Sequence, residues 1–259
     1  MHMQTTTGMT AEHYAILVER MENEFLWQRR RGQPRRLSLA GALQVTLLYY
    51  RHNVTEQLIA DLVGVDQSTV SRTIALVEAM LNVVTDDEQP DVKAALGETT
   101  AVIDGILLPC WSWADAPELY SGKHKTTGHN CQVLADLSGR LIHISDPIPG
   151  KHHDTHAFRE TRLANTLILS NTLADKGYEG TRMVTPIKKR PGEEHLPDHA
   201  KQHNCFVNTH RYVIERTIAN IKTWRIVYTD YRRPLRTFRD AFNAVRGLIF
   251  FTQQKTNFA

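Results

Sequence analysis

The sequence contains little cysteine. Its three cysteines are Cys110, Cys131 and Cys205, and no two of them form a CxxC pair. An odd number of widely spaced cysteines fits neither a disulfide framework nor a cysteine zinc site. We therefore expect reduced thiols with mainly structural roles.

Long hydrophobic runs are absent as well. No apolar stretch approaches the roughly 18 residues that a membrane helix needs, and the N-terminal segment MHMQTTTGMT has no apolar signal-peptide core. We therefore expect a soluble, cytoplasmic protein without a membrane partner. Its hydrophobic content of 41% allows one large core, alone or with a small satellite domain.

The formal net charge is only +3, but the basic residues are unevenly distributed. They are concentrated in four clusters: Arg29–Arg31, Arg35–Arg36, Lys188–Arg190 and Arg232–Arg233. Clusters of this kind suit a polyanion such as DNA. The interpretation that Lys188, Lys189 and the Arg232–Arg233 pair line a DNA path stands beside the alternative that these are solvated loops.

The first predicted helix covers residues 10–27, with Thr10 as its N-cap candidate. The following segment, WQRRRGQPRR at 27–36, is interrupted by Gly32 and Pro34. It is either a linker or an arm along a DNA backbone.

Residues 38–82 have the pattern of a helix-turn-helix domain. A helix from about Leu39 to Tyr50 precedes a short helix at Thr55–Val63, the turn Gly64–Asp66 and a second helix to about Leu81. The short loop with its glycine favours this motif, and Asp66 is placed to cap the second helix. The residues expected to make the internal contacts are Ile59, Leu62, Val65, Val70, Ile74 and Val77.

The start of the second helix carries small polar and basic residues that suit a reader of the DNA major groove. These residues are Gln67, Ser68, Thr69, Ser71 and Arg72. The alternative is a three-helix bundle that does not bind DNA, but the segment GVDQSTVSRTI resembles the recognition element of bacterial helix-turn-helix proteins.

The domain prediction follows from a change of periodicity. Residues 1–84 form a helical region, the acidic stretch within 85–98 is a linker, and 99–259 form a catalytic domain. In that domain we expect a strand at 99–111, a hairpin turning at Asp136–Arg140, a helix at 155–164, strands at Thr166–Leu173 and 183–189, and a long helix. This order predicts an α/β fold with a mixed sheet and flanking helices.

Two aspartates stand out in the predicted strands. Asp104 interrupts an apolar run, and a charged residue in a buried strand is costly unless it is paired or binds metal. Asp175 follows the strand Thr166–Leu173, at the kind of strand end where open α/β sheets have their sites.

The third carboxylate lies in the helical segment Arg211–Lys222, which contains neither Gly nor Pro. Arg211, Glu215 and Lys222 form one stripe beside its apolar face. By itself this stripe is explained by a surface ion pair on a solvated helix. Together with Asp104 and Asp175, Glu215 becomes a candidate metal ligand.

Three carboxylates from separate elements suit Mg²⁺ or Mn²⁺. Two ions about 3.5–4 Å apart would activate an attacking water or 3′-hydroxyl and stabilise the leaving oxygen in phosphoryl transfer. In this hypothesis Asp104 bridges both ions, while Asp175 and Glu215 bind one each.

These motifs resemble a known family. VIDG at Asp104, DKGY at Asp175 and the R-(3)-E-(6)-K spacing around Glu215 resemble the DDE transposases of bacterial insertion sequences. The element GKHHD, which ends at Asp154, is similar to the Gly-Ser-x-His-Asp element of the Harbinger-like group. The resemblance extends from about residue 38 to 250.

The resemblance implies an RNase H-like catalytic fold, metal-dependent strand cleavage at the ends of a mobile element, and strand transfer into a target. It also implies that Arg211 and Lys222 contact phosphates near the scissile bond and that Tyr178 lies against the DNA end. Because two ends must be paired, it implies a homodimer on double-stranded DNA, associated with the nucleoid.

Two positions depart from the family pattern. Asn208 stands where the related signature has Tyr, and Lys151 stands where the group has Ser. Neither is a carboxylate, so they bear on the subgroup and leave the chemistry possible. The alternatives to an active transposase are a transposase-derived DNA-binding protein without transfer activity and a metal-dependent nuclease without a transfer step.

Asp154 and its histidine neighbours allow two further interpretations. Asp154 is either a supporting residue oriented by hydrogen bonds or a substitute metal ligand near Asp104. With His152, His153 and His156 it could instead form a transition-metal site of a hydrolase, although HHDTH lacks the catalytic Glu of a zinc-protease helix.

The tryptophans are interpreted mainly as packing residues. Trp111, Trp113 and Trp224 are more typical of core or rim positions, with base stacking as the alternative.

Overall fold

The computed structural model describes residues 3–28, 33–111, 115–189, 191–193 and 195–253. These residues belong to two compact units, Met1–Gln89 with Lys222–Ala259, and Pro90–Ile221. None of the described helices combines the length and the hydropathy that a bilayer crossing requires.

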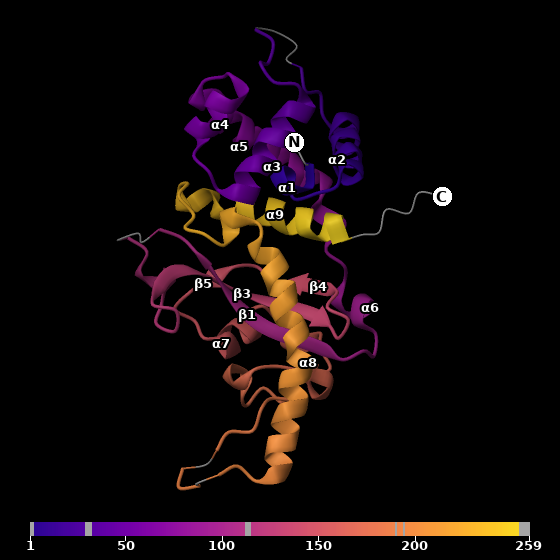
Figure 1. Cartoon of the computed structure of the whole chain (residues 1–259), viewed down its shortest axis with the longest axis vertical. Helices are drawn as coiled ribbons and strands as arrows, with labels where there is room; N and C mark the ends of the chain where they lie inside the picture. The colour runs from indigo at the N-terminus through magenta and orange to yellow at the C-terminus, as the bar shows by residue number, and fades with distance from the viewer. Residues whose placement is uncertain (1–2, 29–32, 112–114, 190, 194, 254–259) are drawn as a thin grey trace. The chain divides into compact units, whose positions relative to one another are not determined.

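The first unit is helical. It contains α1 (Met3–Thr7), α2 (Ala11–Glu24), α3 (Leu39–His52), α4 (Glu56–Val63), α5 (Gln67–Val84) and α9 (Phe238–Gln253), with short 3₁₀ turns η1 (Asp86–Glu88), η6 (Arg225–Val227) and η7 (Leu235–Thr237) (Figure 1). Side-chain caps begin three of these helices: Thr10 accepts the His13 N–H, as predicted, Ser38 accepts the Gly41 N–H and Thr55 the Leu58 N–H.

Helices α4 and α5 form the predicted helix-turn-helix. Gly64 ends α4 with a φ of 68°, a left-handed conformation that glycine adopts without strain. Asp66 occupies the N-cap position of α5, where its backbone carbonyl accepts the N–H groups of Thr69 and Val70, but its side chain makes no capping hydrogen bond.

Most of the expected internal contacts of this motif are confirmed, because Ile59, Val70, Ile74 and Val77 are fully buried. The expectation for Leu62 is wrong, since its side chain is 65% exposed. The buried side of the two-turn helix α4 is set by Ile59 and Ala60. At 3.6 residues per turn, Leu62 points roughly 110° away from the mean direction of Ile59 and Ala60 around the helix axis. Its side chain therefore lies away from the buried side of α4.

The C-terminal segment folds with the N-terminal helices, whereas the sequence predicts it as the end of the catalytic domain. Asn82 Nδ2 of α5 donates to the Asp240 carbonyl of α9 over 3.1 Å. Gly247 of α9 approaches Thr85 so closely that a β-carbon would lie 2.0 Å from its hydroxyl oxygen. The apolar side of α9, which includes Phe242 and Val245, is buried in this unit.

The second unit contains the sheet. Its elements are α6 (Val92–Leu96), β1 (Ala101–Pro109), η2 (Pro117–Leu119), β2 (Tyr120–Ser121), β3 (Thr126–Asp136), β4 (Leu141–Ile144), β5 (Ile148–Pro149), α7 (Asp154–Glu160), η3 (Leu163–Asn165), η4 (Leu169–Asn171), β6 (Thr172–Leu173), η5 (Lys176–Tyr178) and α8 (Asp198–Lys222), whose last residue belongs to the first unit.

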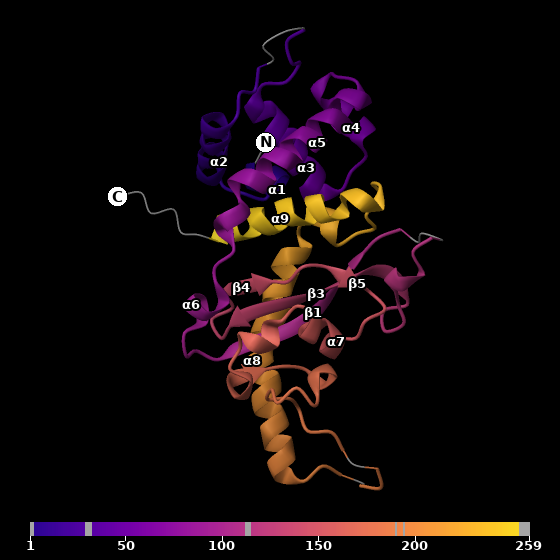
Figure 2. The same cartoon turned by 180° about the vertical axis from the view of Figure 1, so that it is seen from behind.

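Strand β3 organises the sheet, because it pairs antiparallel with β1, β2, β4 and β5. Strand β6 pairs parallel with β1, so the sheet is mixed, as predicted. Helix α8 lies on one face of the sheet and α7 on the other, as the two opposite views show (Figures 1 and 2). The predicted α/β class with flanking helices and a separate N-terminal helical region is confirmed.

The predicted hairpin is present, with Gly139 in the left-handed region between β3 and β4. The strand predicted at Thr166–Leu173 is wrong in length. Only Thr172 and Leu173 pair with β1, because the preceding residues form the 3₁₀ turns η3 and η4. The strand predicted at 183–189 is reduced to a single bridge between Leu173 and Val184.

A hydrophobic core lies on the face of the sheet that α7 covers. Its buried members are Val92, Leu96, Ala101, Ile103, Leu134, Ile142, Phe158, Leu163, Leu167, Ala174, Tyr178 and Met183. This core fixes β1, α7 and η5 against one another; Asp104 lies in β1, Asp154 begins α7 and Asp175 directly precedes η5.

Candidate active site

Asp104 extends from the middle of β1, opposite Val133 of β3. Its Oδ1 accepts the Gly105 N–H over 2.8 Å, and its Oδ2 accepts a hydrogen bond from Arg211 Nη2 of α8 over 3.1 Å. The side chains of Asp104 and Arg211 are 20% and 14% exposed. The carboxylate is thus held between the sheet and α8 with solvent access.

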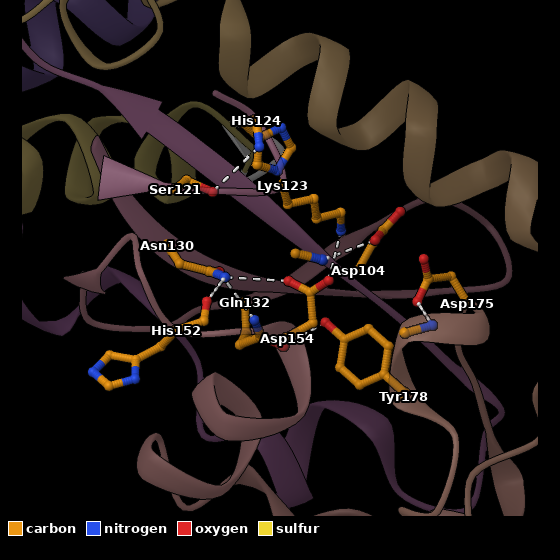
Figure 3. A network of polar contacts seen from close by, with 12 residues as sticks. Asp104, Ser121, Lys123, His124, Asn130, Gln132, His152, Asp154, Asp175 and Tyr178 are labelled. Carbon is orange, nitrogen blue, oxygen red and sulfur yellow. Dashed lines mark hydrogen bonds and ion pairs between the residues drawn. The ribbon is translucent and has the colours of Figure 1, made fainter. Parts of the chain in front are cut away.

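Asp175 and Asp154 reach the same region from two other elements (Figure 3). Asp175 directly precedes η5 and accepts the Gly177 N–H over 2.7 Å. Asp154 is the first residue of α7 and is only 6% exposed. It accepts hydrogen bonds from Lys123 Nζ over 2.7 Å and from Asn130 Nδ2 over 3.2 Å.

Two glycines make room for Asp154 between β1 and η5. A β-carbon at Gly105 would lie 2.3 Å from Asp154 Oδ1. A β-carbon at Gly177 would lie 2.8 Å from Asp175 Oδ1 and 3.3 Å from Asp154 Oδ2. The motifs VIDG and DKGY therefore supply both a carboxylate and the space that brings Asp154 beside it.

The electrostatics of the site favour a cation. Burial raises the pKa of Asp104 to about 6; Arg211 opposes this, while the negative charges of Asp175 and Asp154 raise it further. For Lys123, burial lowers the pKa, but hydrogen bonding and attraction to Asp154 prevail, so that its pKa is raised. The carboxylates repel one another and draw the nearby cations toward them.

A chain of hydrogen bonds between buried polar side chains orients Asp154. The Tyr178 hydroxyl donates to Gln132 Oε1 over 2.5 Å, and Gln132 Nε2 donates to Asn130 Oδ1 over 3.2 Å. Asn130 in turn donates to Asp154. Burial raises the pKa of Tyr178 well above its ordinary value, helped by the charges of the three aspartates, so it is a neutral donor.

The expectation that Tyr178 lies against DNA is therefore wrong. Its side chain has no exposed surface and its ring packs edge-on to Phe158 in the core. Sequence reasoning also missed Lys123, Asn130 and Gln132 as members of the site. Gln132 is a polar residue within the apolar run CQVLA, and this interruption is the signal that could have found it, whereas the turn that holds Lys123 carries no such signal.

Glu215 lies on α8 one helical turn after Arg211, with an exposed side chain. Within the described part of the chain, no three His, Cys, Asp or Glu side chains stand close enough together to form a metal site. Asp104, Asp154 and Asp175 face the same region and influence one another electrostatically, although they are not close enough to hold one ion as a set of three. Glu215 lies at the neighbouring helix surface. Lys222 belongs to the first unit, where its ammonium lies 4.8 Å from the centre of the Tyr228 ring.

The residues expected to read DNA lie at the start of α5. Gln67, Ser68 and Arg72 are exposed, while Thr69 and Ser71 are half-buried. Gln67 Nε2 is hydrogen-bonded to Glu56, and Arg72 folds back on the carbonyl and hydroxyl of Ser68 over 2.9 and 3.1 Å.

The basic clusters have different surroundings. Lys188 and Lys189 are exposed, and Lys188 forms an ion pair with Glu179 over 2.5 Å. Arg233 forms an ion pair with Glu78, with side chains only 14% and 6% exposed, and this contact argues against the DNA path predicted for it. The clusters at 29–31 and 190 lie outside the described residues.

The tryptophans and the histidines near Asp154 were also candidates from the sequence. Trp224 is buried, as expected for packing, Trp111 is 54% exposed, and Trp113 lies outside the described residues. The rings of His152 and His156 stack on one another with their centres 4.0 Å apart. Among the described residues, these histidines belong to no group of three side chains that could hold a metal ion.

Comparisons with known proteins define the class. The family model described as DDE superfamily endonuclease matches residues 103–249, more than half of the chain, and the helix-turn-helix of DDE superfamily endonuclease matches residues 35–85. The two matches describe an endonuclease domain preceded by a helix-turn-helix. The chain is a member of the DDE endonuclease superfamily.

Two curated relatives span most of the chain. A protein of Streptomyces albus G, assigned as the transposase for insertion sequence element IS112, is 29% identical over 85% of this chain and 83% of its own length. A protein of Microchaete diplosiphon, assigned as the transposase for insertion sequence element IS702, is 23% identical over 93% and 91%. No solved structure gives a significant match.

Endonucleases of this superfamily generally use divalent metal ions. The donor chemistry here fits such an ion, because carboxylate oxygens are the ligands that hard divalent cations prefer. Burial is the main cause of the raised pKa of Asp104, and a bound cation would offset the smaller contributions of the Asp175 and Asp154 charges.

Proposed function

We propose that the protein is the transposase of an insertion sequence, which binds the ends of its own element and catalyses DNA strand cleavage and strand transfer. The observation that carries this proposal is the convergence of Asp104 and Asp175 at one site within a matched DDE endonuclease domain. The helix-turn-helix at 35–85 supplies the means to bind the element ends.

We assign metal binding to Asp104, Asp175 and Glu215, with Mg²⁺ or Mn²⁺ as the ion and two ions as the expected number. When bound, the ions would supply Lewis-acid stabilisation and activation of the nucleophile in an in-line displacement. Support for Glu215 comes from its position one turn after Arg211, whose guanidinium already reaches Asp104.

Asp154 and Lys123 have supporting roles in this proposal. Asp154 is anchored by Asn130, and its ion pair with Lys123 keeps an ammonium beside the carboxylates. That ammonium can leave its partner for a phosphate oxygen when DNA enters, because its side chain is 50% exposed. Asp154 then remains as a further negative charge near the metal ligands.

Arg211 is assigned two partners in succession. Without DNA it neutralises Asp104; with DNA and metal bound, it turns toward a phosphate near the scissile bond. Lys222, at the end of the same helix, contacts the DNA backbone. The active form is a homodimer, because transfer of an element requires both of its ends.

The test uses duplex DNA taken from the chromosomal flanks of the coding sequence, where inverted repeats are expected. The purified protein should nick these ends with Mg²⁺ or Mn²⁺ and join the freed 3′ ends to a target plasmid. Chelation by EDTA should stop both reactions. Nicking without joining would support a nuclease, and binding without nicking would support a DNA-binding protein that has lost transfer activity.

A further inference from the structure

A groove of about 510 Å³ lies in the first unit, outside the acidic site and outside the recognition helix. It is lined by Gln4, Thr5, Arg51, His52, Thr223 and Arg225. The six residues come from α1, from the end of α3, from the turn before η6 and from η6 itself, which begins at Arg225. Two arginines and a histidine line it, and none of its lining residues is acidic.

Arg51 is held rigidly in this groove. Its guanidinium carbon lies 5.6 Å from the centre of the Trp224 ring, and its Nη1 donates to the Thr223 hydroxyl. Such stacking and hydrogen bonding fix the planar head of an arginine and leave its other N–H groups available.

No carboxylate is among the described residues that line the groove around Arg51. Burial lowers the pKa of Arg51. Neither Arg51 nor Arg225 takes part in any ion pair between described residues. A half-buried cation without a carboxylate partner is stabilised by an anion from solution.

The other groove residues complete an anion site. Arg225 is exposed at its rim and can close over a bound anion. His52 Nε2 lies 3.1 Å from the Thr5 carbonyl, which fixes the ring beside the arginines. A phosphate oxygen matches the fork of N–H groups that two guanidinium heads present.

The place of the groove points to DNA as the source of that phosphate. Arg51 and His52 end α3, and only Asn53, Val54 and Thr55 separate them from α4. In helix-turn-helix proteins the first helix of the motif crosses the DNA backbone while the second enters the major groove. A basic groove just before α4 is placed where backbone phosphates pass.

We propose that Arg51 and Arg225, on the groove lined by His52 and Thr223, clamp a backbone phosphate of duplex DNA. The contact fixes the position of the protein on the duplex without reading its sequence. This inference rests on the proposed function only in requiring that the protein binds DNA.

The experiment measures DNA binding by the full-length protein in fluorescence anisotropy, with a labelled duplex from the element end and a scrambled duplex of equal length. Arg225→Gln and Arg51→Gln should each weaken binding about tenfold. The loss should be equal for both duplexes. Each variant should lower the slope of log affinity against log salt by about one.

Controls separate folding from binding. Arg225 is exposed, so Arg225→Gln should keep the wild-type melting temperature even if Arg51→Gln does not. Arg236→Gln removes the same charge from an exposed position of the same unit outside the groove. It should leave the affinity within about twofold of wild type, since it removes no clamp contact.

Three outcomes would overturn the proposal. Unchanged affinity and salt slope in both groove variants would exclude the clamp. A loss confined to the element-end duplex would mean base recognition in its place. Binding of inorganic phosphate that both variants abolish, with DNA affinity intact, would assign the groove to a free anion. If the wild-type protein binds no DNA at all, the proposed function itself is contradicted. Failure of the clamp alone is recognised by DNA binding that the groove variants leave unchanged.

Discussion

Arg211 Nη2 donates a hydrogen bond to Asp104 Oδ2 over 3.1 Å and so links α8 to β1 at the candidate active site. Burial raises the pKa of Asp104 to about 6, and Arg211 is the strongest influence in the other direction. The ionised form of this carboxylate depends on its arginine neighbour.

Arg211→Gln should therefore raise the pKa of Asp104 above 6 in the metal-free protein. Carboxyl-carbon NMR titration measures this value directly. Arg216→Gln is the matched control, because Arg216 is an exposed arginine on the same helix, and it should leave the pKa unchanged. A value at or below that of wild type in Arg211→Gln would show that the ion pair does not govern Asp104.

A second prediction concerns the buried ion pair of the first unit. Glu78 is 4% exposed and accepts hydrogen bonds from the Tyr50 hydroxyl over 2.6 Å and from Arg233 Nη1 over 2.5 Å. Arg233→Ala would leave the carboxylate buried without its cation and should lower the free energy of unfolding by about 3–5 kcal/mol.

Urea unfolding followed by circular dichroism measures this loss. Arg236→Ala, at an exposed arginine three residues further on, should change the free energy of unfolding by less than about 0.5 kcal/mol. Equal unfolding midpoints for Arg233→Ala and wild type would contradict the importance of the pair.

A third prediction follows from His129 on β3. Burial lowers the pKa of His129 to about 4, against an ordinary value of 6.5. Between these values the unfolded chain takes up a proton that the folded chain does not. The contribution to stability is complete above pH 6.5 and is lost as the pH falls toward 4, by up to about 3 kcal/mol.

His129→Gln should flatten the stability profile between pH 6.5 and 4, because the proton uptake is removed. Chemical unfolding at half-unit pH steps tests this, with His199→Gln at an exposed histidine as the control. Parallel profiles for wild type and His129→Gln would mean that other groups govern acid destabilisation.

The helix-turn-helix provides a fourth prediction. Arg72 folds against Ser68 on the exposed start of α5, and it must leave this position to reach a base edge. Arg72→Ala should weaken binding to the element end more than binding to a scrambled duplex, because base contacts specify sequence. An equal loss of affinity for both duplexes would contradict base recognition and show that Arg72 contacts only the DNA backbone.

Much of the fold could be predicted from local patterns. The caps at Thr10, Ser38 and Thr55, the glycine turn of the helix-turn-helix and the hairpin at Gly139 all depend on neighbouring residues. The run around Asp104 likewise predicted β1, because β-branched residues flank the aspartate. Such features are encoded over a few positions and survive in the folded chain.

What escaped prediction depends on distant partners. The burial of Tyr178 follows from Gln132, which is 46 residues away, and the docking of Lys222–Ala259 follows from partners such as Glu78 and Thr85. Strand β6 is short because the 3₁₀ turn η4 ends directly before it and η5 begins three residues after it. Tertiary contacts of this kind leave no periodic mark in the sequence.

The candidate site shows the same division. Asp104 and Asp175 were predicted from their positions in apolar strands, and the structure brings them together with Asp154. Lys123 was not predicted, because a lysine in a polar turn is indistinguishable from a solvated one. The metal-binding role of Glu215 stays a prediction from its helix stripe.

Cleavage of element-end DNA by single carboxylate variants tests the central claim most directly. Asp104→Asn, Asp175→Asn and Glu215→Gln should each abolish Mg²⁺-dependent nicking while binding the same DNA nearly as wild type does. Asp198→Asn, at a carboxylate 89% exposed on α8, should nick normally. Normal nicking by Asp104→Asn would contradict the assignment of this site as the catalytic centre.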